Sequence, residues 1–280
     1  MSNIRFVIVD VFTDTPFAGN QLAVFTDARA LTDDQMQMLA REFRFSECAF
    51  VLAPEAGGHA RIRIFTSTSE LAFAGHPVLG TAFVLGAPLQ AIEVRLETGN
   101  GIVPVMLERE GAKIISGRMV QPLPAFETYR DPGPLLSVLG VAHTVLPVET
   151  YYNGARHVLV AVETEDEVAS LAPDPGALAA LGEFGVSCFA ATGTRVKTRM
   201  FEPTVGVTED PASGSAAGPI AVHLARHGVI AWGEEITISQ GAEIGRPSTL
   251  RARAEGGPDR VDLVEVSGCA VIVGKGEFAL

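Results

Sequence analysis

The chain has 280 residues, 47% of them hydrophobic and 19% charged, a composition typical of folded globular proteins and not of disordered ones. This length suits two domains. The net charge of −12, without any cluster of lysine and arginine, argues against nucleic acid as a partner. Three widely spaced cysteines without a CxxC motif indicate a reducing compartment, and we expect the protein to be cytoplasmic.

The first part of the chain predicts strands and one capped helix. The first strand begins so close to Met1 that we expect no signal peptide. A helix should begin after Thr32, because Gln35 completes a capping box with it and the apolar residues that follow recur at helical spacing. Strands are predicted at residues 5–12, 22–25, 48–52 and 61–66.

One uncharged stretch, residues 71–92, needs to be weighed as a membrane span. Glycine and proline interrupt it, and its continuous apolar part is far shorter than the roughly 20 residues that a span requires. We therefore expect no membrane association. Pro77 suits the first turn of a helix, and residues 78–85 are apolar on every face, which predicts a helix surrounded by protein.

The second half of the chain repeats the plan of the first. Its apolar helix is predicted at residues 216–226, opened by the segment 212–215 and stopped by Gly228. We infer an ancient duplication into two similar α+β domains, residues 1–125 and 126–280, with a last strand that can cross back to the first domain. Strands of this half are predicted at residues 151–162, 198–201 and 235–239.

Two helix N-termini provide a candidate anion site. Gly75 and His76 open the first apolar helix, and Gly214 and Ser215 open the second. Free backbone N–H groups and the positive ends of two helix dipoles, facing one cleft, would hold a carboxylate without any lysine. We therefore expect a small carboxylate as the substrate.

Glu47 is the candidate for moving a proton, since it lies just after a helix and just before a strand. One carboxyl group can act as the base at one carbon and as the acid at another when the substrate is small. His76 and Asp210 would tune Glu47 or move a second proton. The alternative is that Glu47 is a surface carboxylate, and that His76, Asp210 and Ser215 only cap helices.

Other kinds of site find less support. His223 and His227 have the spacing of zinc ligands on a helix, but the sequence shows no third ligand and no HExxH motif, so we expect no metal. P-loop and dinucleotide motifs are absent as well. Epimerases of the cysteine type need two thiols, and the segments 74–76 and 212–214 contain none. A small-molecule binding protein without activity is a further alternative.

These segments resemble the PhzF family of phenazine-biosynthesis isomerases, which is related to diaminopimelate epimerase. The resemblance runs through nearly the whole chain. Its motifs include DTPFAGN at residues 14–20, FSE at 45–47, ELAFAGHP at 70–77, GSAAGP at 214–219 and HLARHG at 223–228.

The resemblance implies two pseudo-symmetric domains of the diaminopimelate-epimerase-like fold, each a curved, barrel-like sheet around a central helix, with the active site between them. It also implies a homodimer that uses no metal or organic cofactor. The implied reaction, in phenazine antibiotic biosynthesis, is isomerisation of trans-2,3-dihydro-3-hydroxyanthranilate. A proton moves from C3 to C1, and the resulting enol becomes a ketone.

By matching motif, Glu47 corresponds to the family's catalytic glutamate, and His76 and Asp210 to its supporting acid–base residues. Departures from the family pattern leave another small amino or hydroxy acid, isomerised or epimerised, as the alternative substrate. Those departures are at Gln21, Ser67, Ala72 and Ser213. The substrate-binding positions that the resemblance implies are Asn20, Ser46, Gly75, Gly214 and Ser215.

Overall fold

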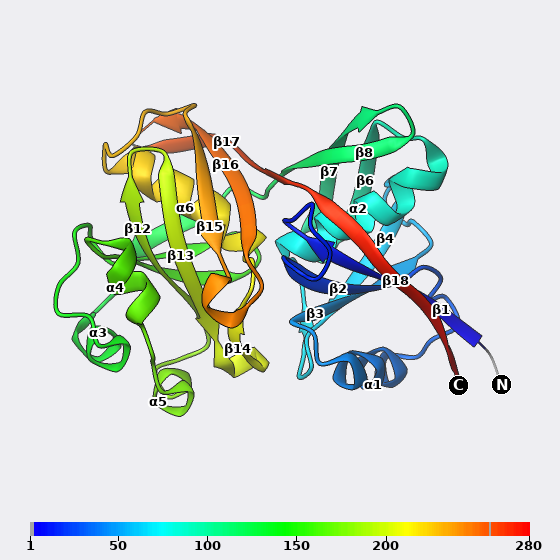
Figure 1. The fold of residues 1–280 in the computed structure, drawn as a ribbon, viewed down its shortest axis with the longest axis horizontal. Helices are drawn as coiled ribbons and strands as arrows, with labels where there is room; N and C mark the ends of the chain where they lie inside the picture. Colours follow the sequence, from blue (N-terminus) through cyan, green and yellow to red (C-terminus); the bar gives the residue numbers. More distant parts are fainter. Residues whose placement is uncertain (1–2, 258) are drawn as a thin grey trace.

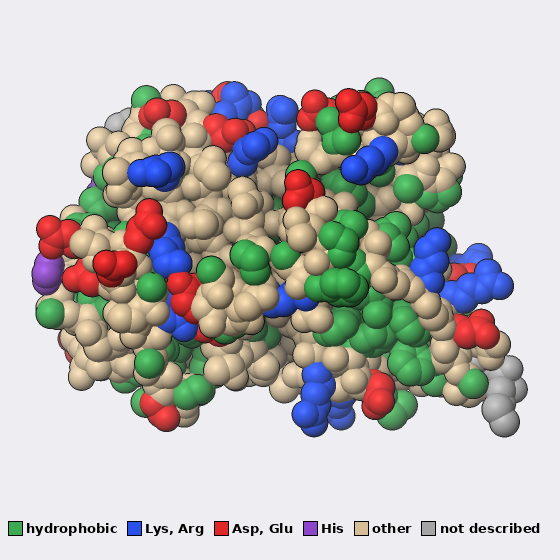
Figure 2. Space-filling model, in the orientation of Figure 1, with side chains coloured by type: hydrophobic (Ala, Val, Ile, Leu, Met, Phe, Trp, Pro, Cys, Tyr) green, Lys and Arg blue, Asp and Glu red, His purple; other side chains and the backbone are tan. Residues whose placement is uncertain are grey.

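The computed structural model describes residues 3–257 and 259–280 and shows two lobes of similar build side by side (Figure 1). Each lobe is a curved, open sheet with one helix on its inner face, so the predicted α+β class is confirmed. No helix in the described residues is long and apolar enough to cross a membrane. Acidic and basic side chains are interspersed over the face shown in Figure 2.

The first lobe is built from the N-terminal strands and two helices, α1 (Asp33–Phe43) and α2 (Gly75–Leu89). Thr32 and Gln35 form the predicted capping box at the start of α1. The strands are β1 (Asn3–Val11), β2 (Asn20–Phe25), β3 (Glu47–Leu52), β4 (Ala60–Phe65), β5 (Glu70–Leu71), β6 (Glu93–Thr98), β7 (Gly101–Glu110) and β8 (Lys113–Val120).

The second lobe holds the remaining helices: α3 (Gly133–Leu139), α4 (Glu165–Ser170), α5 (Pro175–Ala179), α6 (Gly214–Arg226) and the 3₁₀ turns η1 (Pro203–Val205) and η2 (Ala242–Ile244). Its strands are β9 (Ala125–Thr128), β10 (Glu149–Tyr152), β11 (Arg156–Ala161), β12 (Gly185–Thr192), β13 (Arg195–Glu202), β14 (Val207–Asp210), β15 (Glu235–Gln240), β16 (Ser248–Gly257) and β17 (Arg260–Gly268).

Strand pairing follows the same order in both lobes. In the first lobe β1 pairs with β2, β2 runs parallel to β3, β4 runs parallel to β6, and β7 and β8 close the series. In the second lobe β10 to β13 and β15 to β17 repeat these steps. A parallel pair needs a crossover connection, and α2 and α6 are the crossovers at equivalent places. This repetition supports the inferred duplication.

Two strand pairings join the lobes. β8 of the first lobe pairs with β17 of the second, with Val120 opposite Glu265. The last strand, β18 (Ala270–Ala279), leaves the second lobe and runs antiparallel to β1, with Ala279 opposite Asn3 (Figure 1). The domain boundary at residue 125 stays a prediction, although it falls where β9 begins.

One strand expectation is wrong. Residues 151–162 form a hairpin of β10 and β11 and not one strand. The turn between them contains Asn153 and Gly154. Gly154 has φ +107°, a backbone conformation that residues other than glycine rarely adopt. The buried site residue Asn153 therefore lies in a turn.

The two central helices are buried as the sequence predicted. Every residue of α6 from Gly214 to Ala225 is buried, and so is α2 from Gly75 to Val84. Both helices contribute to one apolar cluster, which also contains side chains from both sheets. Burial on all faces explains why neither helix needs a polar side.

Replacing a core residue of α2 tests this packing. Leu79 is 0% exposed, whereas Leu89, at the end of the same helix, is 65% exposed. We expect Leu79→Ala to lower the free energy of unfolding by about 2–5 kcal/mol, because the removed methyl groups leave a cavity. The control Leu89→Ala should change it by less than about 0.5 kcal/mol. Equal effects in urea unfolding would show that α2 is not the packed centre of its lobe.

Candidate active site

The two helix N-termini meet where the lobes meet, and glycine makes this possible. A Cβ atom built on Gly75 would lie 2.6 Å from both the carbonyl carbon of Gly214 and the backbone nitrogen of Ser215. A Cβ on Gly214 would lie 3.1 Å from Gly75 Cα and 2.8 Å from the Phe12 ring. No other residue type fits at either position without moving backbone. The starts of α2 and α6 are therefore in direct backbone contact.

Neither helix is capped by a side chain. Ala74 precedes α2 and has no polar atom to offer, and Ser213 precedes α6 but makes no capping hydrogen bond. The first-turn N–H groups of both helices are thus directed toward the same region, together with the positive ends of two dipoles. This arrangement favours an anion.

A cavity of about 430 Å³ opens at this point and is lined by both lobes. The predicted residues Glu47, His76, Asp210, Gly75, Gly214 and Ser215 all line it. Its other polar lining residues are Thr68, Ser69, Arg156, Glu183, Glu202, Thr204 and Ser213. The apolar part of the wall includes Leu71, Phe73, Met200, Val205 and Val207.

Glu47 and His76 face each other in this cavity. Glu47 is the first residue of β3, and His76 lies in the first turn of α2. Their facing atoms, Glu47 Oε2 and His76 Nε2, are 3.5 Å apart, and each is buried without a hydrogen-bond partner. Both atoms are therefore available to a ligand.

Burial decides the charge of this pair. Loss of solvation raises the pKa of Glu47 well above its ordinary value, and the nearby carboxylates of Asp210 and Glu202 raise it further. Burial also lowers the pKa of His76 to about 3, so its imidazole is neutral near pH 7. A neutral imidazole has one donor and one acceptor nitrogen. It can therefore face Glu47 in either protonation state of the carboxyl group.

Asp210 ends β14 and is held by several hydrogen bonds. Asn20 Nδ2 donates to Asp210 Oδ1 at 2.7 Å, and Ser213 Oγ donates to Asp210 Oδ2 at 2.6 Å. Burial raises the pKa of Asp210, while hydrogen bonds from Ser213, Ser46 and Asn20 act in the opposite direction. Gln240 holds the segment in turn, since its Nε2 donates to the Asp210 carbonyl at 2.7 Å. Asp210 is thus a rigidly placed carboxylate.

Two predicted substrate-binding residues lie behind the cavity wall. Asn20 is 1% exposed, and its Nδ2 lies 3.1 Å from His76 Nδ1 as well as near Asp210. It links the two candidate residues but does not line the cavity. Ser46 lines a neighbouring hollow with Phe45 and Glu209, and reaches the site through Asp210. Asn20 and Ser46 therefore contact the cavity-lining residue Asp210 from behind the wall.

The structure adds residues that sequence reasoning did not single out. Glu202, the last residue of β13, lines the cavity as a further carboxylate beside Glu47 and Asp210. Gln121 donates to the Gly214 carbonyl at 2.7 Å, and Asn153 donates to the Ser215 carbonyl at 2.9 Å. No local motif marks Glu202, because its place depends on the pairing of β13 with β12.

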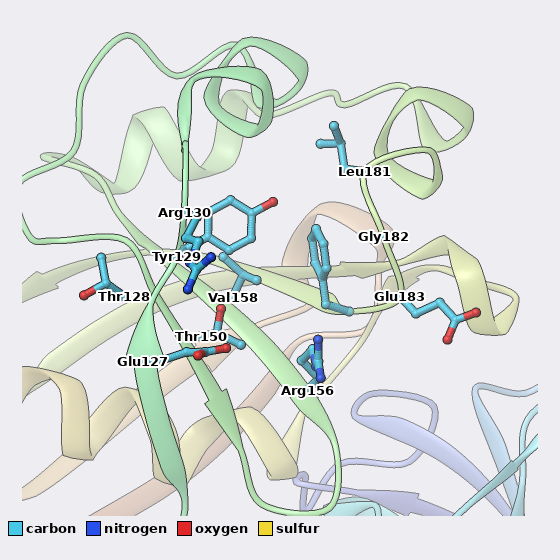
Figure 3. Close-up of a pocket in the computed structure, with 11 residues that line it drawn as sticks. Glu127, Thr128, Tyr129, Arg130, Thr150, Arg156, Val158, Leu181, Gly182 and Glu183 are labelled. Atoms are coloured by element: carbon cyan, nitrogen blue, oxygen red, sulfur yellow. The ribbon is translucent and has the colours of Figure 1, made fainter.

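A second hollow of about 370 Å³ lies in the second lobe beside this cavity (Figure 3). Arg156 and Glu183 line both spaces. In Figure 3 they lie on the side of the hollow that is nearest the first lobe, drawn in blue. Both side chains are exposed, so they mark the outer edge of the central cavity.

The histidine pair on α6 has a third partner that the sequence did not reveal. Glu149 Oε2 lies 3.1 Å from His223 Nδ1 and 3.4 Å from His227 Nε2. The same oxygen accepts from Arg226 at 2.6 Å and from Tyr151 at 2.8 Å. Glu149 Oε2 is thus the centre of a network that joins both histidines, Tyr151 and Arg226.

This cluster makes stability depend on pH. Burial raises the pKa of Glu149, but hydrogen bonds from His223 and Tyr151 and the nearby Arg226 outweigh it and lower the pKa to about 2. A depressed carboxylate pKa means that the stabilisation is complete above the ordinary value of 4.5 and is lost as the pH falls toward 2.

We expect Glu149→Gln to lower the free energy of unfolding at pH 7 by about 1–3 kcal/mol, because it leaves the part-buried Arg226 without its charge partner. The difference from the unaltered protein should shrink between pH 4.5 and pH 2. Urea unfolding across this range measures it. The exposed Glu165 of α4 supplies the control, Glu165→Gln, which should show no such trend. A pH-independent difference would contradict the assignment.

The glycine contact gives a second test. Gly75→Ala should lower stability by about 1–3 kcal/mol, because the added Cβ pushes α2 away from α6. The matched control is Gly133→Ala at the first position of α3, where the added Cβ meets its nearest atom at 3.5 Å. Thermal unfolding of both variants decides the point. A Gly75→Ala protein as stable as the control would show that the two helix starts are not in contact.

Comparison with known proteins places the chain in one family. The family described as Phenazine biosynthesis-like protein (PhzC-PhzF) matches residues 9–276. The trans-2,3-dihydro-3-hydroxyanthranilate isomerase of Pseudomonas aeruginosa is 48% identical over 276 residues, 99% of each chain. That of Pseudomonas fluorescens is 47% identical over the same length and share.

Solved structures agree in fold. A predicted epimerase of Pseudomonas aeruginosa superposes with a TM-score of 0.86 at 30% identity, covering 99% of each chain. A hydroxyproline epimerase from Agrobacterium vitis reaches a TM-score of 0.69 over 99% of this chain and 91% of its own, and its 14% identity supports likeness of fold alone. Family profile, full-length identity and fold lead to one conclusion: the chain belongs to the PhzC-PhzF family of phenazine-biosynthesis-like proteins.

Proposed function

We propose that the protein is an isomerase that moves a proton from C3 to C1 of trans-2,3-dihydro-3-hydroxyanthranilate in phenazine biosynthesis. The observation that carries the proposal is Glu47, whose Oε2 is buried without a hydrogen-bond partner and whose pKa is raised, in a cavity beside two uncapped helix N-termini. Full-length similarity to isomerases named for this substrate supports the choice of ligand.

The substrate carboxylate would bind at the start of α2 and α6. Backbone N–H groups around Gly75 and Gly214 offer donors there, and both glycines keep the approach free of side chains. Donors fixed by the backbone need not reorganise as charge develops on the substrate. The carboxylate at C1 would draw negative charge toward that end of the ring and favour protonation at C1.

Glu47 would act first as base and then as acid. Its ionised carboxylate removes the proton from C3, and the electron pair shifts the two ring double bonds so that C1 becomes the basic carbon. The protonated Glu47 then delivers the proton to C1. The hydroxyl group at C3 now stands on a double bond as an enol, which becomes the ketone. A raised pKa makes Glu47 a stronger base, which suits removal of a proton from carbon.

His76 and Asp210 would support this transfer. Neutral His76, with Nδ1 accepting from Asn20 Nδ2, would donate from Nε2 to the ionised form of Glu47. Asp210, tied to Asn20 and Ser213, holds negative charge near Glu47 and keeps its pKa high. Ser46 and Asn20 would act as positioning residues behind them.

We also propose a cytoplasmic homodimer. The free cysteines Cys48, Cys188 and Cys269 suit a reducing compartment. Hydrophobic side chains gather over the region of β18 and β1 on the face in Figure 2, a surface that a second copy would cover. Light scattering after size exclusion should give about twice 29.5 kDa. The mass of one chain would reject the dimer.

Turnover in D₂O tests the role of Glu47. We expect the unaltered protein to consume trans-2,3-dihydro-3-hydroxyanthranilate, followed by absorbance and NMR, and Glu47→Gln to be slower by about 10²–10⁴-fold, because the amide cannot take the proton. The control is Glu42→Gln, an exposed change in α1 that should leave the rate unaltered. No turnover by folded, unaltered protein would reject this substrate, and full activity of Glu47→Gln would reject the base.

A further inference from the structure

Glu202 is a carboxylate in the cavity that the proposed proton transfer does not use. It ends β13, just before the η1 turn, and lines the cavity together with Glu47 and Asp210. None of the described residues donates a hydrogen bond to it, whereas Asp210 has several donors. Glu202 thus presents free acceptor atoms to whatever fills the space.

The internal repeat explains how Glu202 reaches this place. In the first lobe Glu47 begins β3, where it pairs with Leu22 of β2. In the second lobe Gly185 begins the corresponding strand β12, where it pairs with His157 of β11. A Cβ built on Gly185 would clash with Met200 Cε and lie 3.3 Å from Glu202 Oε2. The side chains of Met200 and Glu202 therefore fill the space that a side chain at this position would occupy.

The charges in the cavity are unbalanced without a ligand. Four carboxyl groups line it, one of them Glu183 at the exposed edge, and His76 is neutral near pH 7 because its pKa is about 3. Among the described lining residues Arg156 is the one permanent cation, and it is exposed at the outer edge. A ligand that brought only a carboxylate would add a fifth acidic group. A ligand that also carried an ammonium group would compensate one of them.

We propose that Glu202 binds the amino group of the substrate as an ammonium ion, and so restricts the site to amino acids whose ring carries the amine beside the carboxylate. This proposal rests on the proposed function and names a residue that determines its specificity. The carboxylate end lies on the helix N-termini, and the ammonium end lies toward β13. Glu202 is a specificity residue and takes no part in moving the proton.

The ionisation of Glu202 agrees with this geometry. Burial and the nearby Asp210 raise its pKa to about 8, so that most of the free protein holds a proton there near pH 7. An ammonium group beside it would favour the ionised form and lower the pKa again. The groups that face it are Glu47, Asp210 and the neutral His76.

Binding of two matched acids tests the proposal without relying on turnover. The ligands are trans-2-aminocyclohexane-1-carboxylate and cyclohexanecarboxylate, which differ only in the ammonium group, measured by calorimetry at pH 8. We expect the unaltered protein to bind the amino acid at least about tenfold more tightly, the value of a charge-assisted hydrogen bond. Glu202→Gln should bind both acids about equally, with affinity for cyclohexanecarboxylate retained.

The control variant is Glu183→Gln, since Glu183 lines the same cavity but is exposed at its edge. It should keep the preference. Circular dichroism and thermal unfolding show that both variants are folded, and Glu202→Ala serves if the glutamine variant is not. Equal binding by the unaltered protein, no binding of either acid, or a preference kept in Glu202→Gln would overturn the proposal.

The two proposals fail separately. If the unaltered protein prefers the amino acid through Glu202 but does not turn over trans-2,3-dihydro-3-hydroxyanthranilate, the specificity residue stands and the substrate is wrong. If turnover depends on Glu47 but Glu202→Gln lowers kcat without changing KM or the ligand preference, the proposed function stands and Glu202 belongs to the proton transfer.

Discussion

The backbone contact between Gly75 and Gly214 is the constraint on which the site depends. Two sheets can place their central helices end to end only if no side chain separates the first turns. That contact puts two sets of uncapped N–H groups beside one cavity and brings Glu47 of one lobe near Asp210 of the other. Gln121 and Asn153 secure it by binding the carbonyl groups of Gly214 and Ser215.

The cavity favours a bound anion but disfavours negative charge on its own carboxyl groups. Helix N-termini favour an anion, while burial and neighbouring carboxylates disfavour charge on Glu47, Glu202 and Asp210. These demands are compatible only if positive and negative potential lie at different ends of the bound molecule. The polar side chains behind the wall, Asn20 and Gln240, hold Asp210 in place beside Glu47. The empty site is therefore prepared for a ligand of uneven charge.

Much of the first-turn geometry could be predicted from the sequence, because it is local. Pro77 after His76, small residues along α6 and glycine at both helix starts identify two buried helices, and their N-termini follow. Glu202 and Glu149 could not be predicted, because the role of each depends on residues that are distant in the sequence. Glu202 lies beside Gly185 across a hairpin, and Glu149 contacts His223, His227 and Arg226 on α6. The strand expected at residues 151–162 was wrong because the turn at Asn153 and Gly154 divides the segment into β10 and β11.

The return of β18 to β1 affects the order in which the molecule can be completed during synthesis. β1 lies between β2 and β18, and β18 follows the whole second lobe in the chain. While the ribosome is still making the second lobe, one edge of the first sheet has unpaired backbone groups. Such an edge can pair wrongly with other chains. The edge of the nascent first lobe beside β1 thus stays exposed until β18 emerges.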